Sequence, residues 1–472
     1  MADIRYVCLS DMHLGAETSL LTNLETASSK IDATRPSPVL EQLVACLREL
    51  ISKNENPHPK PTLVLNGDIL ELALAQDRFA AMCFERFIEL IMPPDDPVFD
   101  RIVYNPGNHD HHLWETARET QYVSNYLSVT KWGSALEDPW HTTNIFNYKN
   151  AVPSYFLNGL IHRQAHLKDM DIETAYPNFG VLSPDGRKCV IFSHGHFIEP
   201  LYVLMSTLLT MLFPANQMPV DVWDLEAENF AWIDFFWSAL GRSEDVGRGV
   251  GRIYEKLQSE KELKKLLRNM ANSLALKYDL PGWGDRMEAK LLECAFSIIA
   301  DKISGLERNK PERSLSEDAE KGLWAYMEGP LRKQILVDTN KMPLNTTFVF
   351  GHTHKPFQED MNFAGYAEWV SVYNSGGWIV DRVKLAPHYG GAVVLIDENL
   401  DGVSLRMYNE ATDYKNHVEE ARHPGDDPNP FHARISGLVE RSHALWETFS
   451  HTVARAVNVR AQNLRARINS PC

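Results

Sequence analysis

Short apolar runs that stop at turn or polar residues recur along the chain and predict buried β-strands. Runs of about four to eight residues, rich in β-branched and aromatic side chains, are typical of strands in the interior of a sheet. Segments 38–52 and 79–91, which separate the first three runs, have apolar residues at helical spacing. This alternation of strand and helix predicts an α/β fold. The strand-like runs are 4–9, 62–66, 101–104, 188–192 and 346–350.

The pattern changes after Phe197. Up to about Asn345 the chain is helical in character, and we predict a helical insertion over 197–345 that includes amphipathic helices at 256–271 and 286–302. The most apolar stretch, 201–213, is shorter than the roughly 20 residues that a transmembrane helix needs. A buried helix is the plain interpretation of this stretch. The alternative is a cap that receives an apolar substrate or touches a membrane surface.

Strand-like runs return at 346 and are followed near the C-terminus by a Pro- and Asp-rich stretch and a helical pattern. The helical tail ends in several arginines, including Arg460. A helix that docks on the body or on a partner subunit is the plain interpretation, and a basic surface helix at a membrane is the alternative. The predicted organisation is a core in two parts, 1–196 and 346–412, with the insertion 197–345 between them, a linker at 413–434 and a C-terminal amphipathic helix at 435–472.

Length, charge and cysteine content limit the class of protein. The 472 residues suffice for one large domain with an insertion or for two domains. The net charge of −16 argues against a general nucleic-acid-binding surface, because phosphate backbones require a basic footprint. The six cysteines lack CxxC spacing, which favours a reducing compartment. The N-terminus leads directly into a strand, so we expect a cytoplasmic protein without a signal peptide, with peripheral contact to a membrane as a variant of that expectation.

The strand-like runs share a second feature, because each is followed by side chains that can bind metal. In an α/β sheet, ligands gather outside the carboxyl ends of the strands, so we expect these side chains to converge on one edge. Mixed oxygen and imidazole groups suit Mn²⁺, Fe or Zn²⁺ better than Ca²⁺. The groups are too numerous for one ion and suit two ions that share a carboxylate, an arrangement that serves displacement at phosphorus. They are Asp11, His13, Asp68, Asn108, His109, His194, His352 and His354.

Taken in order, the motifs DxH, GD, GNHD, HGH and GHTH resemble those of the calcineurin-like metallophosphoesterase superfamily. The motifs span roughly residues 4–378 and leave the insertion and the tail unmatched. The resemblance implies a four-layer β-sandwich flanked by helices and a hydrolase of phosphoric ester or anhydride bonds. It also implies two divalent metal ions, with Mn²⁺ as the first choice and Fe or Zn²⁺ as alternatives.

The same resemblance gives each candidate residue a role. The first ion would be held by Asp11, His13 and His354, the second by Asn108, His194 and His352, and Asp68 would bridge both. His109 would contact the scissile phosphate and act as general acid, with Asp110 orienting it. The nucleophile would be a hydroxide that bridges the two ions.

Two further residues lie near these motifs without an assigned place in the chemistry. Glu71 follows Asp68 closely, and we interpret it as a helix-start carboxylate, with a supporting position behind the ligands as the alternative. His196 is interpreted as a neighbour of the ligand shell.

The substrate is a phosphodiester or a pyrophosphate in our interpretation. Segments 10–14 and 351–356 are similar to the UDP-diacylglucosamine pyrophosphate hydrolases, whose helical insertion holds acyl chains. Those enzymes have Arg where this chain has His109, and their insertion is smaller. Despite these differences, the similarity and the apolar insertion make a small-molecule or lipid-linked phosphoester the expected partner. The sequence indicates no oligomeric state.

Two alternatives to this hydrolase stay open. The GNHD and SDMHLG motifs also resemble the DNA-repair nucleases of the superfamily, against which the acidic net charge argues. A non-catalytic scaffold of the same fold is the other alternative. Such scaffolds usually lose ligands or the general-acid histidine, and this chain keeps them.

Overall fold

The structure is a computed structural model of the chain. It describes residues 2–25, 30–146, 152–213, 215–241, 313–380, 382, 384–411, 416–422 and 429–469. The helices predicted at 256–271 and 286–302 lie outside these residues.

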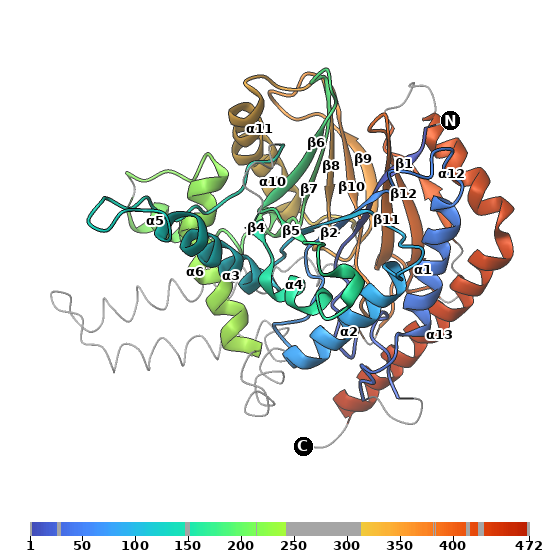
Figure 1. The fold of residues 1–472 in the computed structure, drawn as a ribbon. Helices are drawn as coiled ribbons and strands as arrows, with labels where there is room; N and C mark the ends of the chain where they lie inside the picture. Colours follow the sequence, from blue (N-terminus) through green and yellow to red (C-terminus); the bar gives the residue numbers. More distant parts are fainter. Residues whose placement is uncertain are drawn as a thin grey trace.

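Two β-sheets form the centre of the molecule (Figure 1). The first has eight strands in the order β13-β12-β11-β1-β2-β3-β5-β4, and the second has five in the order β6-β7-β8-β10-β9. Strands β1, β2 and β3 are parallel, and so are β7, β8 and β10, so the carboxyl ends within each set lie at one edge. The strands are β1 Ile4–Leu9, β2 Thr62–Asn66, β3 Arg101–Asn105, β4 Val152–Pro153, β5 Glu173–Thr174, β6 Asn178–Leu182, β7 Lys188–Ser193, β8 Asn345–Phe350, β9 Phe357–Met361, β10 Val370–Asn374, β11 Gly390–Asp397, β12 Gly402–Asn409 and β13 His417–Glu419.

Helices cover the outer faces of the sheets (Figure 1). The helices are α1 Pro38–Ile51, α2 Asp77–Ile91, α3 His111–Tyr122, α4 Tyr155–Ile161, α5 Leu204–Leu212, α6 Val222–Gly241, α10 Glu317–Tyr326, α11 Arg332–Thr339, α12 Pro430–Arg441 and α13 His443–Asn469. Shorter helical turns are η1 Val123–Leu127, η2 Ala165–Leu167, η3 His196–Ile198 and η6 Met327–Leu331.

The alternation of side chains along each strand builds three apolar cores. In β1, Cys8 faces the core between the two sheets, whereas Val7 and Leu9 face the helices on the outer side. The outer core of the eight-stranded sheet includes α1, α2, α12 and α13, and that of the five-stranded sheet includes α6, α10 and α11. This gives four layers, helix–sheet–sheet–helix, and confirms the predicted fold class.

The described part of the predicted insertion is helical and packs on the five-stranded sheet. Its apolar side chains join those of the sheet, and Asn178 of β6 donates hydrogen bonds to Tyr326 of α10 (2.8 Å) and to Gln334 of α11 (2.8 Å). In α6, the amide of Asn229 fastens α5 by donating to Ser206 (2.8 Å). None of the helices within the described ranges is long and apolar enough to cross a membrane.

The end of the chain is more structured than the sequence pattern indicates. Strand β13 pairs with β12 inside the segment predicted as a linker. Helix α12 begins at Pro430, which suits a first helical turn because that position needs no backbone N–H. The predicted tail helix is divided at Ser442 into α12 and α13. The apolar face of α13 is buried in the core that also holds α1, as the docking interpretation of the tail predicts.

Candidate metal centre

The loops that follow β1, β2, β3, β7 and β8 meet at one place between the two sheets. Backbone hydrogen bonds join them directly: Asp11 N–H donates to Gly67 O (2.9 Å), and His13 N–H donates to Asp68 O (2.9 Å). Gly351 N–H donates to His194 O (3.0 Å), which links the loops of the second sheet. The polar side chains on these loops are buried. The structure therefore brings the predicted ligands together as the strand-end rule leads one to expect.

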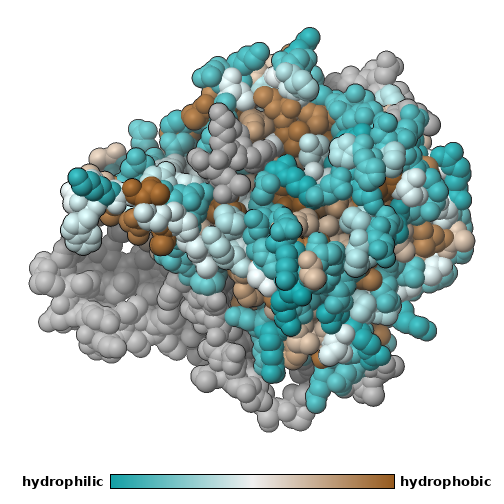
Figure 2. Space-filling view, viewed as in Figure 1, coloured by the Kyte–Doolittle hydropathy of each residue, from teal (hydrophilic) through white to brown (hydrophobic). Residues whose placement is uncertain are grey.

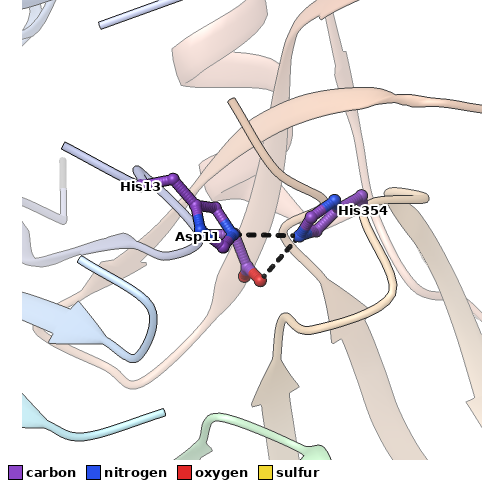
Figure 3. A group of neighbouring side chains, drawn as sticks. All are labelled: Asp11, His13 and His354. Carbon is purple, nitrogen blue, oxygen red and sulfur yellow. Dashed lines mark hydrogen bonds and ion pairs between the residues drawn. The ribbon is translucent and has the colours of Figure 1, made fainter. Parts of the chain in front are cut away.

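One group of possible ligands consists of Asp11, His13 and His354 (Figure 3). His354 Nε2 lies 3.2 Å from Asp11 Oδ1 and 3.3 Å from His13 Nε2. The three come from the ends of β1 and β8, so the two sheets both contribute. Their ligand atoms lie within 4.8 Å of one another, close enough for one ion.

The second group consists of Asp68, His194 and His352, with Asn108 beside them. His194 Nε2 lies 3.0 Å from Asn108 Oδ1, 3.2 Å from His352 Nδ1 and 3.5 Å from Asp68 Oδ2. The same Asp68 oxygen lies 3.8 Å from His13 Nε2 of the first group. Asp68 therefore stands between the two groups.

The donor set fits divalent metal ions. Two pairs of imidazole nitrogens lie close together inside the protein: His194 with His352 at 3.2 Å, and His13 with His354 at 3.3 Å. In each pair only one nitrogen can donate a proton to the other. Asp68 Oδ2 is buried without a hydrogen bond among the described residues. A cation that accepts lone pairs from carboxylate, amide and imidazole groups satisfies both observations.

The carboxylates keep their negative charge despite burial. Burial raises the pKa of Asp11, but the hydrogen bond from His354 and the charge on His194 outweigh it and lower the pKa below its usual value. Burial acts in the same direction on Asp68, whose pKa is nevertheless held well below the usual value by His194 and His109. Burial alone would lower the pKa of His194, and Asp68 raises it to about 9. The pocket is thus prepared to accept positive charge.

The backbone at these residues is strained. Asp11, His13, Asp68, His352 and His354 all have positive φ, between 44° and 68°. For residues other than glycine this conformation costs roughly 1 kcal/mol or more each, and it persists only where the surrounding structure enforces it. Nothing in the sequence pattern indicates this strain.

Two glycines make the close approach of these loops possible. Gly67 has a φ of 86°, and a Cβ atom there would lie 2.2 Å from Nδ1 of His194. A Cβ atom on Gly107 would lie 2.3 Å from Oδ1 of Asp68. The GD and GNHD motifs therefore need their glycines for space as well as for the turn.

Glu71 occupies a different position from the one favoured by the sequence. Helix α2 begins only at Asp77, so Glu71 is not a helix-start carboxylate. Its buried side chain instead accepts from the rings of His13 (Nδ1, 2.8 Å) and His109 (Nδ1, 2.9 Å). The pKa of Glu71 is lowered because, against the effect of burial, His109 and His13 stabilise the anion. The only signal in the sequence is a carboxylate inside the otherwise apolar stretch 69–73.

The motif resemblance predicts that Asp110 orients His109, whereas in the structure its carboxylate binds backbone N–H groups. It accepts from the backbone N–H groups of Gly107 (2.7 Å) and Ile69 (2.8 Å), and more weakly from those of Asp68 and Leu70 (both 3.3 Å). The structure thus gives the contact with the His109 ring to Glu71, while Asp110 fastens the loop after β3 to the loop after β2. Burial and the charge of Asp68 raise the pKa of Asp110 to about 6.

Residues outside the predicted set complete the wall around His352. Glu199 Oε1 lies 3.6 Å from His352 Nε2, and the ring of Tyr202 packs edge-on against the ring of His352 at 5.1 Å. Both precede α5 in the predicted insertion. Their position could not be inferred from the sequence, because they follow the HGH motif in a segment that reads as ordinary apolar chain.

Comparison with known proteins agrees with this geometry. Residues 4–222 match the family model described as Calcineurin-like phosphoesterase, which confirms the resemblance drawn from the motifs. The matched segment contains every candidate ligand except His352 and His354. None of the curated proteins compared with the chain matches it.

Proposed function

We propose that this chain, whose residues 4–222 match the calcineurin-like phosphoesterase model, is a member of that family and hydrolyses a phosphodiester or pyrophosphate bond with two divalent metal ions. The observation that carries the proposal is the pair of buried ligand groups with Asp68 between them. A single shared carboxylate between two sets of imidazole ligands is suited to a dinuclear centre.

The residues that would hold the ions are the two groups described above. Asp11, His13 and His354 would hold one, Asn108, His194 and His352 would hold the other, and Asp68 would contact both. Such a pair of ions, with Mn²⁺ as the first choice and Fe or Zn²⁺ as alternatives, neutralises charge at phosphorus and lowers the pKa of bound water.

His109 is the proposed general acid. It is buried beside both ligand groups, and its ring packs edge-on against that of His13 with centroids 4.8 Å apart. Because Glu71 accepts from Nδ1, the ring is held in one orientation, and its Nε2 is the nitrogen that would deliver a proton to the leaving oxygen. Burial lowers the pKa of His109, and Glu71 acts against burial by stabilising the cationic form of the ring that the acid role requires.

An apolar or lipid-linked substrate is the favoured class within this proposal. A small cluster of hydrophobic residues is visible at the left end of the molecule, where Figure 1 labels α5 (Figure 2). Exposed apolar side chains include Val129 and Trp132 after η1, Phe213 and Val220 after α5, and Trp223 in α6, and Trp132 is 99% exposed. This surface supports contact with apolar groups or with the periphery of a membrane. The net charge of −16 supports a substrate other than nucleic acid.

The test is metal analysis of the purified protein together with Mn²⁺-dependent hydrolysis of bis-p-nitrophenyl phosphate and p-nitrophenyl phosphate. We expect about two ions per chain and faster hydrolysis of the diester. Faster hydrolysis of the monoester would move the substrate to the phosphomonoesters. A protein that binds no metal and hydrolyses neither ester would contradict the proposal and favour the scaffold.

A further inference from the structure

A second buried polar network lies behind the metal centre, and its central residue comes from the predicted insertion. Glu226 of α6 is fully buried, with 0% of its surface exposed. One carboxylate oxygen lies 3.3 Å from Nε2 of His111, and the other accepts from the hydroxyl of Tyr176 at 3.2 Å. The same hydroxyl lies 2.9 Å from Nε2 of His196. A single carboxylate thus joins two histidines, one directly and one through a tyrosine.

These two histidines stand next to the candidate ligands on different sheets. His111 follows His109 by two residues and begins α3, after β3 of the eight-stranded sheet. His196 follows His194 by two residues, after β7 of the five-stranded sheet. Glu226 therefore connects the loop that carries Asn108 with the loop that carries His194.

Ring packing extends this connection to the ligands themselves. The rings of His196 and His194 have centroids 5.5 Å apart, and the ring of Tyr202 packs on both His196 (5.6 Å) and His352 (5.1 Å). A displacement of the His196 ring would therefore also displace the rings of His194 and His352. The first group, by contrast, has its own support in Glu71.

Burial of Glu226 is costly, and the packing of α6 does not require it. A carboxylate removed from water loses several kcal/mol of solvation unless hydrogen bonds replace the water. Leu225 and Ile233 of the same helix already supply apolar contacts to the core. The hydrogen bonds of the carboxylate with His111 and Tyr176 explain its burial, because they fix the spacing between the two loops.

We propose that Glu226 is a positioning residue of the metal centre that sets the distance between Asn108 and His194 and so forms the second ion site. The inference rests on the proposed function, since it assumes that this group binds metal. It gives the predicted insertion a role in building the site beyond that of a cover. Glu226 lies outside the segment matched by the family model, which ends at residue 222.

The experiment titrates the metal-free, full-length protein with Mn²⁺ and follows free Mn²⁺ by electron paramagnetic resonance. Glu226→Gln keeps the shape but leaves one acceptor oxygen in place of two. Tyr176→Phe removes the hydroxyl that joins Glu226 to His196 and leaves the contact between Glu226 and His111 in place. Asp224→Asn, at an exposed carboxylate of the same helix, is the matched control. Circular dichroism and thermal unfolding confirm that each variant is folded.

We expect the first Mn²⁺ to bind both variants as it binds the wild type, and the second to bind about 10- to 100-fold more weakly. Activity should return when Mn²⁺ is raised to saturate the second site, which a variant with general structural damage would not show. The control should match the wild type in both respects.

Wild-type protein that binds two ions, with variants that bind both equally well, would overturn the inference and leave the proposed function intact. Loss of both ions together would also overturn it, because the effect would then not be confined to the second site. Wild-type protein that binds no ion would overturn the proposed function and this inference with it.

Discussion

The two halves of the candidate metal centre are built from similar ligands but supported from different parts of the chain. The group of Asp11, His13 and His354 has its buried carboxylate support in Glu71, which lies in the loop after β2 within the matched segment. The group of Asn108, His194 and His352 is bordered by Glu199 and, one step further, by Glu226, both from the predicted insertion. One half therefore has its carboxylate support in the loop after β2, whereas the carboxylates around the other half come from the segment between β7 and β8.

The first half has an added support of its own at a greater distance. Arg460 of α13 is buried, and its guanidinium donates to the backbone oxygens of Ser19 (2.9 and 3.2 Å) and Thr22 (2.6 Å). The Ser19 hydroxyl in turn donates to Met12 O (2.7 Å), between Asp11 and His13. The tail thus holds the loop that carries two ligands of the first group.

The largest effect should come from the residue that the two halves share. Asp68→Asn removes a negative charge from both groups, and we expect loss of at least one ion and a fall in Mn²⁺-dependent diester hydrolysis of about 10³-fold or more. Metal analysis and bis-p-nitrophenyl phosphate assays measure this. Asp77→Asn, at an exposed position that starts α2, is the control. A fully active Asp68→Asn protein would show that the halves do not act as one centre.

Glu71→Gln should distinguish the two halves of the centre by weakening the binding of one ion and not of the other. The amide offers one acceptor oxygen to two histidine rings and no charge to the His109 imidazolium, so we expect diester hydrolysis to fall about 10- to 100-fold. Mn²⁺ titration should show weaker binding at one site only. Together with Glu226→Gln, the prediction is a crossed pattern in which each variant weakens a different ion.

The control for Glu71→Gln is Glu41→Gln on the exposed side of α1. A Glu71→Gln and Glu226→Gln double variant that loses no more than either single variant would contradict the division of the centre into two separately supported halves.

The contrast between ligands and supports also marks what the sequence could predict. Asp68 and His194 were predictable because polar residues directly after apolar strands meet at one sheet edge. Glu226 was not, because inside the helical segment 222–241 a glutamate reads as a solvated side chain until its partners from two other loops are known. Glu71 was not predictable as a support either, because its partners His13 and His109 come from two other loops and α2 begins only at Asp77.

The positive φ values at the metal centre were equally unpredictable from the sequence. Left-handed conformation is uncommon for residues other than glycine, and it is held here by hydrogen bonds between loops, such as the one that Ile69 N–H donates to Asp110. Such long-range constraints leave no local trace in the sequence. The layers of the fold were predictable because the periodicity of apolar residues is itself local.

A smaller effect is expected from Arg460→Met, which keeps an apolar stem and removes the charge. Burial lowers the pKa of Arg460 to about 10, and its loss removes the guanidinium donors to the buried carbonyl oxygens of Ser19 and Thr22. We expect the free energy of unfolding to fall by about 2 kcal/mol. The first Mn²⁺ should bind several-fold more weakly, because Arg460 holds Ser19, whose hydroxyl donates to Met12 O between the ligands Asp11 and His13. Urea denaturation and Mn²⁺ titration measure the two effects.

Arg455→Met, exposed on the same helix, is the control for Arg460→Met. If Arg460→Met destabilises the protein and leaves both Mn²⁺ affinities unchanged, the tail supports the fold but not the first half of the centre.

The smallest effect should come from a buried carboxylate outside the centre. Burial raises the pKa of Asp397 to about 6, and the negative charge of Asp401 acts in the same direction, in contrast to Asp11 and Asp68, whose pKa values histidines lower. A raised pKa in the folded state stabilises the protein at low pH, and this contribution is lost as pH rises through about 6. Asp397→Asn keeps the oxygen that accepts from Asn399 and Asp401 N–H, so the variant should gain stability over the wild type by about 1 kcal/mol between pH 5 and pH 7.5. Thermal and urea unfolding at the two pH values measure this gain. If the stability of the variant relative to the wild type is the same at both pH values, or falls as the pH rises, burial does not raise the pKa of this carboxylate.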